Sequence, residues 1–151
     1  MKYRRNIGLG EAIAMQMTDF VHSLHWQLDV LIPVPLGKKR LKERGYNQVA
    51  LVARPLAYQI GIRYEPDALW KTRETRSQVG LTISQRSENV QNAYQADSAV
   101  VKDKSVLIMD DVATTGSTIS ACTAALHSAG AQEVYVLTIA RALPHHGLDR
   151  V

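Results

Sequence analysis

Cysteine is almost absent from this sequence, since Cys122 is the single one among 151 residues. One thiol cannot form an internal disulfide bond, and it is too little for a metal site built on a cysteine cluster. Cys122 falls on the apolar side of a predicted helix. We therefore expect a buried structural thiol there rather than a reactive one.

The sequence also lacks long apolar runs. None approaches the roughly 18 residues that span a bilayer, and the basic start at residues 1–5 has no apolar stretch behind it, as a signal peptide would. With 46% hydrophobic and 21% charged residues, the composition is that of an ordinary globular protein. We expect one cytoplasmic domain over residues 1–151, without membrane contact.

Aromatic residues are few, at 6% of the chain. Surfaces that bind single-stranded nucleic acid usually combine clustered Lys and Arg with exposed aromatic rings. The net charge of +4 permits a polyanionic partner without requiring one, because proteins that bind small phosphorylated ligands are often basic too.

One segment, residues 106–118, combines several features of an anion-binding site. Its four apolar residues, 106–109, have the length and bulk of a strand buried on both faces. Asp110 and Asp111 follow, and then come a short loop of small residues and a helical pattern that stops at Gly130. The first N–H groups of a helix lack internal partners and lie at the positive end of its dipole, so this turn predicts a phosphate site.

The side chains of the loop would complete this phosphate site. The hydroxyl groups of four residues can donate hydrogen bonds to an anion: Thr114, Thr115, Ser117 and Thr118. Gly116 would let the backbone come close to a ligand or adopt a positive φ.

The two carboxylates narrow the choice of ligand. Asp110 and Asp111 would repel a bare phosphate, but carboxylates accept hydrogen bonds from sugar hydroxyl groups or help to hold a divalent cation. A ligand with a phosphate and a diol a few ångströms apart, such as ribose 5-phosphate, suits both parts of the segment. The simpler interpretation is an ordinary strand-to-helix turn, but capping explains only one or two of these residues.

Three apolar segments predict buried parallel strands, at residues 29–35, 105–110 and 133–141. Helical patterns lie between and before them. Helices that alternate with buried strands predict an α/β fold with a mostly parallel central sheet, flanked by helices on both faces.

The helices are predicted from the spacing of their apolar residues. The first covers residues 8–25, with Gly8 and Gly10 in the turn that starts it. A second runs from its N-cap Asn47 to residue 60, with a kink or a restart at Pro55. Residues 82–85 have the form of a capping box for a short third helix.

Two polar segments have both a structural and a functional interpretation. Residues 38–44 carry five cations after the first strand, so they form either a solvated basic helix or part of a site at the edge where open α/β sheets bind ligands. Residues 71–81 contain little that could form a core. They are either a connection or a lid.

Residues 106–118 resemble the phosphoribosyl pyrophosphate (PRPP) signature of type I phosphoribosyltransferases, with four apolar residues, two acids and a loop that ends in Thr-Gly-Ser-Thr. Within that superfamily the chain most resembles the ComF (competence protein F, GntX-like) family. The closer resemblance covers the chain from about Lys2 to Ala142. It rests on residues 33–36, 44–48 and 78–81, and on Arg86 and Asn89-Val90 after them.

The resemblance implies the type I phosphoribosyltransferase fold and, as activity, transfer of a phosphoribosyl group from PRPP, which is a glycosyltransferase reaction. Asp110 and Asp111 would form the catalytic pair that holds the ribose diol. The loop for the 5-phosphate would consist of Ala113, Thr114, Thr115, Gly116, Ser117 and Thr118. The sequence identifies neither the acceptor nor the oligomeric state.

The same resemblance implies a function for each of the two polar segments, residues 38–44 and 71–81. Arg40 and Arg44 would bind pyrophosphate, because guanidinium forks suit its oxygens. Arg73, Arg76 and Gln78 would belong to a flexible loop that closes over PRPP and excludes water. The implied cofactor is Mg²⁺, bound through PRPP near the two carboxylates and not by a cluster of protein ligands.

Two alternatives to an enzyme stay open. A non-catalytic sensor of PRPP or a nucleotide would need residues 106–118 and nothing else. A DNA-uptake accessory protein that binds single-stranded DNA, a helicase or another protein of the competence machinery is implied by the family name, and residues 38–44 are its support. Many ComF-like proteins carry an N-terminal zinc-binding segment that this sequence lacks, so we expect a truncated form or a domain used alone.

Overall fold

A computed structural model describes residues 2–73, 80–85, 92–113 and 116–141. The helices are α1 (Lys2–Ser23), α2 (Lys38–Arg44), α3 (Ala50–Ile60), α5 (Ser98–Val101) and α6 (Ser117–Ser128). The strands are β1 (Val30–Pro33), β2 (Arg63–Tyr64), β3 (Leu69–Lys71), β4 (Tyr94–Ala96), β5 (Ser105–Ala113) and β6 (Glu133–Arg141).

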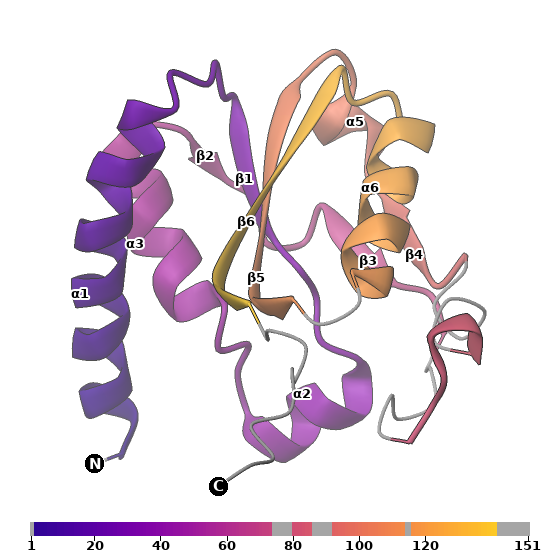
Figure 1. The fold of residues 1–151 in the computed structure, drawn as a ribbon, viewed down its shortest axis with the longest axis horizontal. Coiled ribbons are helices and arrows are strands. Elements are labelled where there is room, and N and C mark those ends of the chain that lie inside the picture. Colours follow the sequence, from indigo (N-terminus) through magenta and orange to yellow (C-terminus); the bar gives the residue numbers. More distant parts are fainter. Residues whose placement is uncertain (1, 74–79, 86–91, 114–115, 142–151) are drawn as a thin grey trace, which may run out of the picture.

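Strands β2, β1, β5 and β6 form a parallel sheet in that order. Helices α1 and α3 lie on one side of the sheet, while α6 and the small hairpin of β3 and β4 lie on the other (Figure 1). This arrangement confirms the predicted α/β fold. The carboxyl ends of β1, β5 and β6 point to one edge of the sheet, and α2 lies beyond that edge (Figure 1).

Two apolar clusters hold the layers together, and β5 contributes to both. Val106 and Ile108 pack on the side of α6, whereas Leu107 and Met109 pack on the side of α3, because successive side chains of a strand point to opposite faces. All four are fully buried. This explains why β5 is a continuous apolar run rather than an alternating one.

The strand predicted at residues 105–110 continues in the structure to Ala113, the last residue of β5. Strand β1 stops where Pro33 pairs with Met109, but β6 continues beside β5 until Arg141 pairs with Ala113. Asp110 and Asp111 therefore lie in the last part of a paired strand and not in the loop after it. The predicted strand at residues 133–141 is confirmed as β6.

The hairpin of β3 and β4 is antiparallel and separate from the main sheet. The sequence also predicts a strand near residues 68–73, which the structure shows as β3, but it did not indicate β4. Strands of three residues are too short to show an alternating pattern, and their order depends on what they pack against. Here Leu69 and Tyr94 are buried in the cluster on the side of α6.

Helix α1 begins before the predicted turn, so Gly8 and Gly10 lie within it. A Cβ atom on Gly10 would lie 2.5 Å from the carbonyl oxygen of Leu51 in α3. Helix α3 continues through Pro55 without the expected restart. Because proline has no N–H, that carbonyl lacks its usual helical donor four residues later, and α1 packs over it at Gly10.

We predict that Gly10→Ala lowers the free energy of unfolding by about 1–3 kcal/mol, because the new methyl group would push α1 away from the backbone of α3. Gly8→Ala is the matched control, since a Cβ there meets no atom within 4 Å. It should raise stability by up to about 1 kcal/mol through helix propensity alone. Urea denaturation of both variants measures the difference. Equal effects of the two substitutions would contradict a close contact at Gly10.

Candidate functional site

The candidate site lies at the carboxyl edge of the sheet, where three chain segments meet. Strand β5 supplies Asp110 and Asp111, the turn after it leads into α6, and the segment after β1 supplies α2. Val34 donates a backbone hydrogen bond of 2.8 Å to the carbonyl of Met109, which keeps β1 beside β5 up to the first carboxylate.

The two carboxylates are fixed by backbone donors of their own strand. Oδ1 of Asp110 accepts a hydrogen bond of 2.8 Å from the N–H of Asp111, and Oδ1 of Asp111 accepts one of 2.8 Å from the N–H of Val112. Asp110 continues the row of Val106 and Ile108 toward α6. Both carboxylates are therefore oriented before any ligand binds.

Burial raises the pKa of Asp110 from an ordinary 3.8 to about 6, and the neighbouring carboxyl of Asp111 adds to the rise against the lowering effect of the backbone N–H. Its charge in turn contributes to raising the pKa of Tyr94 and of Cys122, which are raised mainly by burial. Asp110 thus lies close to both side chains. A carboxylate with weakened solvation gains much from a cation or a hydroxyl donor.

The start of α6 provides the described part of the predicted phosphate loop. Gly116 adopts a left-handed conformation with φ of 78° and precedes the first turn, and its carbonyl accepts a hydrogen bond of 2.8 Å from the N–H of Ser120. Ser117 and Thr118 are the first two residues of the helix. Thr114 and Thr115 lie outside the described residues, and Ala113 ends β5.

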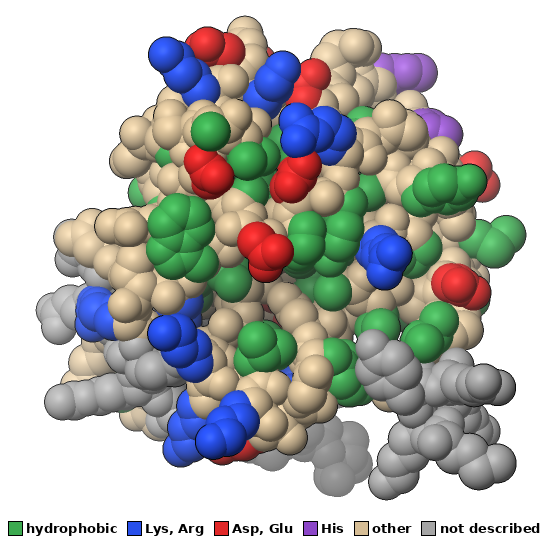
Figure 2. All heavy atoms as spheres, turned by 180° about the vertical axis from the view of Figure 1, so that it is seen from behind, with side chains coloured by type: hydrophobic (Ala, Val, Ile, Leu, Met, Phe, Trp, Pro, Cys, Tyr) green, Lys and Arg blue, Asp and Glu red, His purple; other side chains and the backbone are tan. Residues whose placement is uncertain are grey.

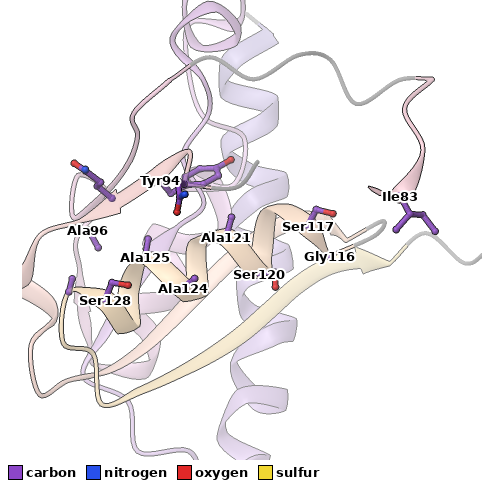
Figure 3. Close-up of a pocket in the computed structure, with 13 residues that line it drawn as sticks. Ile83, Tyr94, Ala96, Gly116, Ser117, Ser120, Ala121, Ala124, Ala125 and Ser128 are labelled. Atoms are coloured by element: carbon purple, nitrogen blue, oxygen red, sulfur yellow. The ribbon is translucent and has the colours of Figure 1, made fainter. Parts of the chain in front are cut away.

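A groove of about 1000 Å³ leads away from this turn along α6. Figure 3 shows small side chains of α6, such as Ser117 and Ala121, along one wall, with Tyr94 of β4 beside them. Ile83 stands near its mouth. The small side chains leave the N-terminal turn of α6 open to a ligand.

The segment of residues 44–48 holds α2 in place at the edge. The side-chain amide of Asn47 donates to the carbonyl of Val34 at 3.0 Å, while its Oδ1 accepts the N–H of Val49 at 3.1 Å. Asn47 thereby joins the end of β1 to the start of α3, which begins at Ala50 with Val49 as its N-cap. Asn47, which was predicted as the N-cap of this helix, lies two residues before the observed N-cap, Val49, and links the end of β1 to the start of α3 instead.

The two arginines predicted to bind pyrophosphate differ in their surroundings. The guanidinium of Arg44 donates to Oε1 of Gln48 at 2.8 Å. The charge of Arg40 lowers the pKa of Tyr94 slightly, against the larger rise that burial causes. Both side chains are exposed.

Sequence reasoning missed Lys71 and Tyr94. They are opposed across the hairpin, and Nζ of Lys71 lies 5.9 Å from the centre of the Tyr94 ring. The only signal in the sequence was the position of Lys71 at the start of the polar segment. Of the predicted loop residues, Arg73 is exposed beyond β3, whereas Arg76 and Gln78 lie outside the described residues.

Two smaller predictions are confirmed. The capping box forms, since the N–H of Thr82 donates to Oε1 of Gln85 at 3.0 Å and the N–H of Gln85 to Oγ1 of Thr82 at 3.3 Å. Cys122 is fully buried in the cluster beside α6, and burial keeps its pKa well above the usual range. The thiol therefore stays protonated and structural.

Within the described residues, no three His, Cys, Asp or Glu side chains come together as a metal site. The donor set at the edge is the pair Asp110 and Asp111, and two carboxylate groups suit Mg²⁺ that takes its other ligands from phosphate oxygens and water. The same described part of the chain contains no helix with the length and apolarity needed to cross a bilayer.

We predict that Asp110→Asn raises the free energy of unfolding by about 1 kcal/mol near pH 7.5, a figure discounted for partial exposure, with little change near pH 4. The folded state binds the proton of Asp110 more tightly than the unfolded state, because the pKa rises on folding. The contribution of Asp110 to the free energy of unfolding of the wild type should therefore fall as pH rises from about 4 to about 6 and then level off. Urea unfolding across this range measures the effect.

The control for this experiment is Asp19→Asn, which removes the same charge from an exposed position of α1. The difference in the free energy of unfolding between pH 4 and pH 7.5 should be the same in this variant as in the wild type. An Asp110→Asn variant with the same pH profile as the wild type would contradict the assigned burial of Asp110.

Comparisons with known proteins identify the family of this chain. Residues 48–149 match the family described as Phosphoribosyl transferase domain. DNA utilization protein YhgH of Escherichia coli O6:H1 is 36% identical over 115 residues, which cover 76% of this chain and 50% of the relative. Competence protein F of Haemophilus influenzae is 35% identical over 118 residues, or 76% of this chain and 51% of the relative. The chain thus spans about half the length of these relatives.

A solved structure of glutamine PRPP amidotransferase from B. subtilis superposes with a TM-score of 0.56 at 26% identity. The superposition covers 89% of this chain and 26% of the other. The fold and the matched segment agree. The chain therefore belongs to the phosphoribosyltransferase domain family, and among its members it is similar to the proteins named for competence and DNA utilization.

Proposed function

We propose that this protein binds PRPP together with Mg²⁺ and transfers the phosphoribosyl group to an acceptor, releasing pyrophosphate. The observation that carries the proposal is the placement of two pre-oriented carboxylates, Asp110 and Asp111, directly before the N-terminal turn of α6. A helix N-terminus attracts phosphate, and the acids accept hydrogen bonds from a diol. PRPP carries both groups.

Each part of the site has a role in this proposal. The 5-phosphate lies on the backbone and hydroxyl groups of Gly116, Ser117 and Thr118, and the ribose hydroxyl groups donate to Asp110 and Asp111. Arg40 and Arg44 extend from α2 toward the pyrophosphate. Bound Mg²⁺ would be held by PRPP near Asp110 and Asp111 and would supply positive charge that offsets the charge of the pyrophosphate.

The reaction is a substitution at the anomeric carbon of the ribose. A bond forms from the acceptor to this carbon while the bond from the carbon to the pyrophosphate oxygen breaks, and its electron pair leaves with pyrophosphate. The ribose passes through an oxocarbenium-like state, so the carboxylates and the cations at the edge contribute mainly positioning and charge stabilisation. The proton of the acceptor leaves to solvent in this scheme, since no side chain is assigned as a base.

The names of the relatives, DNA utilization protein and competence protein, support a place for this activity in DNA utilization or competence. A second candidate function follows from the same names and from one observation. Figure 2 shows Lys and Arg side chains gathered at the end of the molecule where α2 lies, and all its cations are exposed. A surface of this kind suits single-stranded DNA, and binding that weakens steeply with salt would mark it.

We predict that the wild type binds PRPP with Mg²⁺ in roughly the micromolar range and that Asp110→Asn/Asp111→Asn weakens this binding by about 100-fold or more. Each charge-assisted hydrogen bond to the diol contributes about 1.5–3 kcal/mol, so loss of both has a large effect. Isothermal titration calorimetry with and without Mg²⁺ measures both proteins.

The matched control for the double variant is Glu11→Gln/Asp19→Asn, which removes two negative charges from exposed positions of α1. Its affinity should equal that of the wild type. Absence of binding by the wild type would refute the proposal. Binding without transfer to any of a panel of purines, pyrimidines and amines would favour the sensor, which shares the site but not the chemistry.

We predict that Arg40→Ala weakens binding of PRPP and of pyrophosphate by about three- to tenfold but leaves binding of ribose 5-phosphate unchanged. The reason is that the proposal assigns Arg40 of α2 to the pyrophosphate group, which ribose 5-phosphate lacks. Lys39→Ala serves as the control, because it removes the same charge from the neighbouring position. An equal loss in both variants would indicate a general electrostatic effect of α2 rather than a specific contact.

A further inference from the structure

Strand β6 forms one edge of the parallel sheet. Within the described residues it pairs with β5 alone. Figure 1 looks onto this edge, because β6 is the strand nearest the viewer and neither α1 nor α6 crosses in front of it. An edge strand carries a row of backbone N–H and C=O groups that its own sheet does not satisfy, so it can pair with a strand of another chain.

The hydrogen bonds at the start of β6 show which of its backbone groups point outward. The N–H of Gln132 donates to the carbonyl of Lys104 at 2.9 Å, on the side of β5, and Glu133 makes only a longer bond of 3.4 Å to the same carbonyl. Successive backbone groups of a strand point to opposite sides, so the even-numbered residues of β6 turn toward β5. The N–H and C=O groups of Tyr135, Leu137 and Ile139 therefore lie at the open edge.

The sequence of β6 lacks the residues that usually protect an edge strand. Proteins place lysine or proline there to prevent pairing with other chains. The charged residues of β6 stand at its two ends, Glu133 and Arg141, and residues 134–140 between them contain no charge, proline or glycine. Val136 is 37% exposed in the middle of this stretch. The edge is thus long, uncharged and partly apolar, as in strands that form interfaces.

The strand is also complementary to itself. When two copies of β6 are placed antiparallel with Leu137 opposite Leu137 of the second copy, Glu133 stands opposite Arg141 at both ends of the pair. Tyr135 stands opposite Ile139, and pairs of an aromatic and a β-branched residue are favourable across strands, as are pairs of opposite charge. These opposed residues are all odd-numbered, so this register uses the outward backbone groups. The match points to a second copy of this chain as the occupant of the edge.

We propose that two copies of this protein associate through β6, antiparallel and about a two-fold axis at Leu137, so that their sheets join into one. Such an interface is isologous, since both copies contribute the same surface. Backbone hydrogen bonds supply affinity, and the opposed side chains fix the register. The inference does not depend on the proposed function, because β6 carries none of the residues assigned to PRPP.

The first test is sedimentation equilibrium of the whole chain between about 1 and 500 µM, which should show monomers that associate into dimers as the concentration rises. Hydrogen exchange at the highest concentration should slow by about tenfold or more at the amides of Tyr135, Leu137 and Ile139. The amides of Val136 and Thr138 are the internal control, since they face β5 in the monomer already. A wild type that stays monomeric would overturn the inference and leave the edge to a strand of a different protein. A dimer in which the three outward amides exchange as in the monomer would overturn it as well.

Charge reversal tests the register. Glu133→Arg places like charges opposite each other at both ends of the pair and should raise the dissociation constant of the dimer by about tenfold or more. Glu133→Arg/Arg141→Glu restores opposite charges and should return the constant close to the wild-type value. Glu11→Arg is the matched control, because it reverses the same charge at an exposed position of α1. A double variant that stays as weak as Glu133→Arg would refute the antiparallel register.

Val136→Lys tests the open edge itself. The added lysine is the residue that proteins use to block edge pairing, and the exposure of Val136 lets the monomer keep its fold. Dimers should be lost, while circular dichroism and urea unfolding of the dilute variant should match those of the wild type. Dimerisation at wild-type strength in a folded Val136→Lys variant would place the interface elsewhere and overturn the inference.

Discussion

The pairing of β5 with β6 beyond the end of β1 is the constraint on which the candidate site depends. Strand β1 ends at Pro33, which pairs with Met109 of β5, whereas β6 pairs with β5 as far as Ala113. Asp110 and Asp111 therefore belong to a strand that pairs with β6 but, among the described strands, no longer pairs with β1. The result is a pair of carboxylates fixed by the sheet and still accessible from one side.

This arrangement has an electrostatic cost. Asp110 continues the side-chain row that packs under α6, so its carboxylate is partly removed from water, and Asp111 adds a like charge beside it. Ionised Asp110 is thus poorly satisfied in the protein alone. A cation or a pair of hydroxyl donors would stabilise the ionised carboxylate of Asp110. The free-energy cost of this charge, which lowers the stability of the protein at neutral pH, therefore favours binding of a ligand that carries such groups.

The parts of the site that could be predicted from the sequence are the local ones. The run of apolar residues, the two acids, Gly116 and the start of α6 are contiguous, so their geometry follows from one strand, one turn and one helix. The end of β5 could not be predicted correctly, because it is decided by β6, about twenty residues later. Gly10 was misread for a similar reason, since its contact with Leu51 is a property of two packed helices and not of either sequence pattern.

Tyr94 and Lys71 show most clearly what could not be predicted from the sequence. Neither belongs to a motif, and each lies on a strand of three residues whose pattern is too short to interpret. Their place is decided by the packing of the hairpin against α6, which buries Tyr94 in the same cluster as Ile108 and Cys122. A prediction of the phosphate-binding turn from the sequence alone therefore misses part of its surroundings. Its donors come from the contiguous segment, but the ring of Tyr94 that packs beside α6 comes from an element that only the packed structure places there.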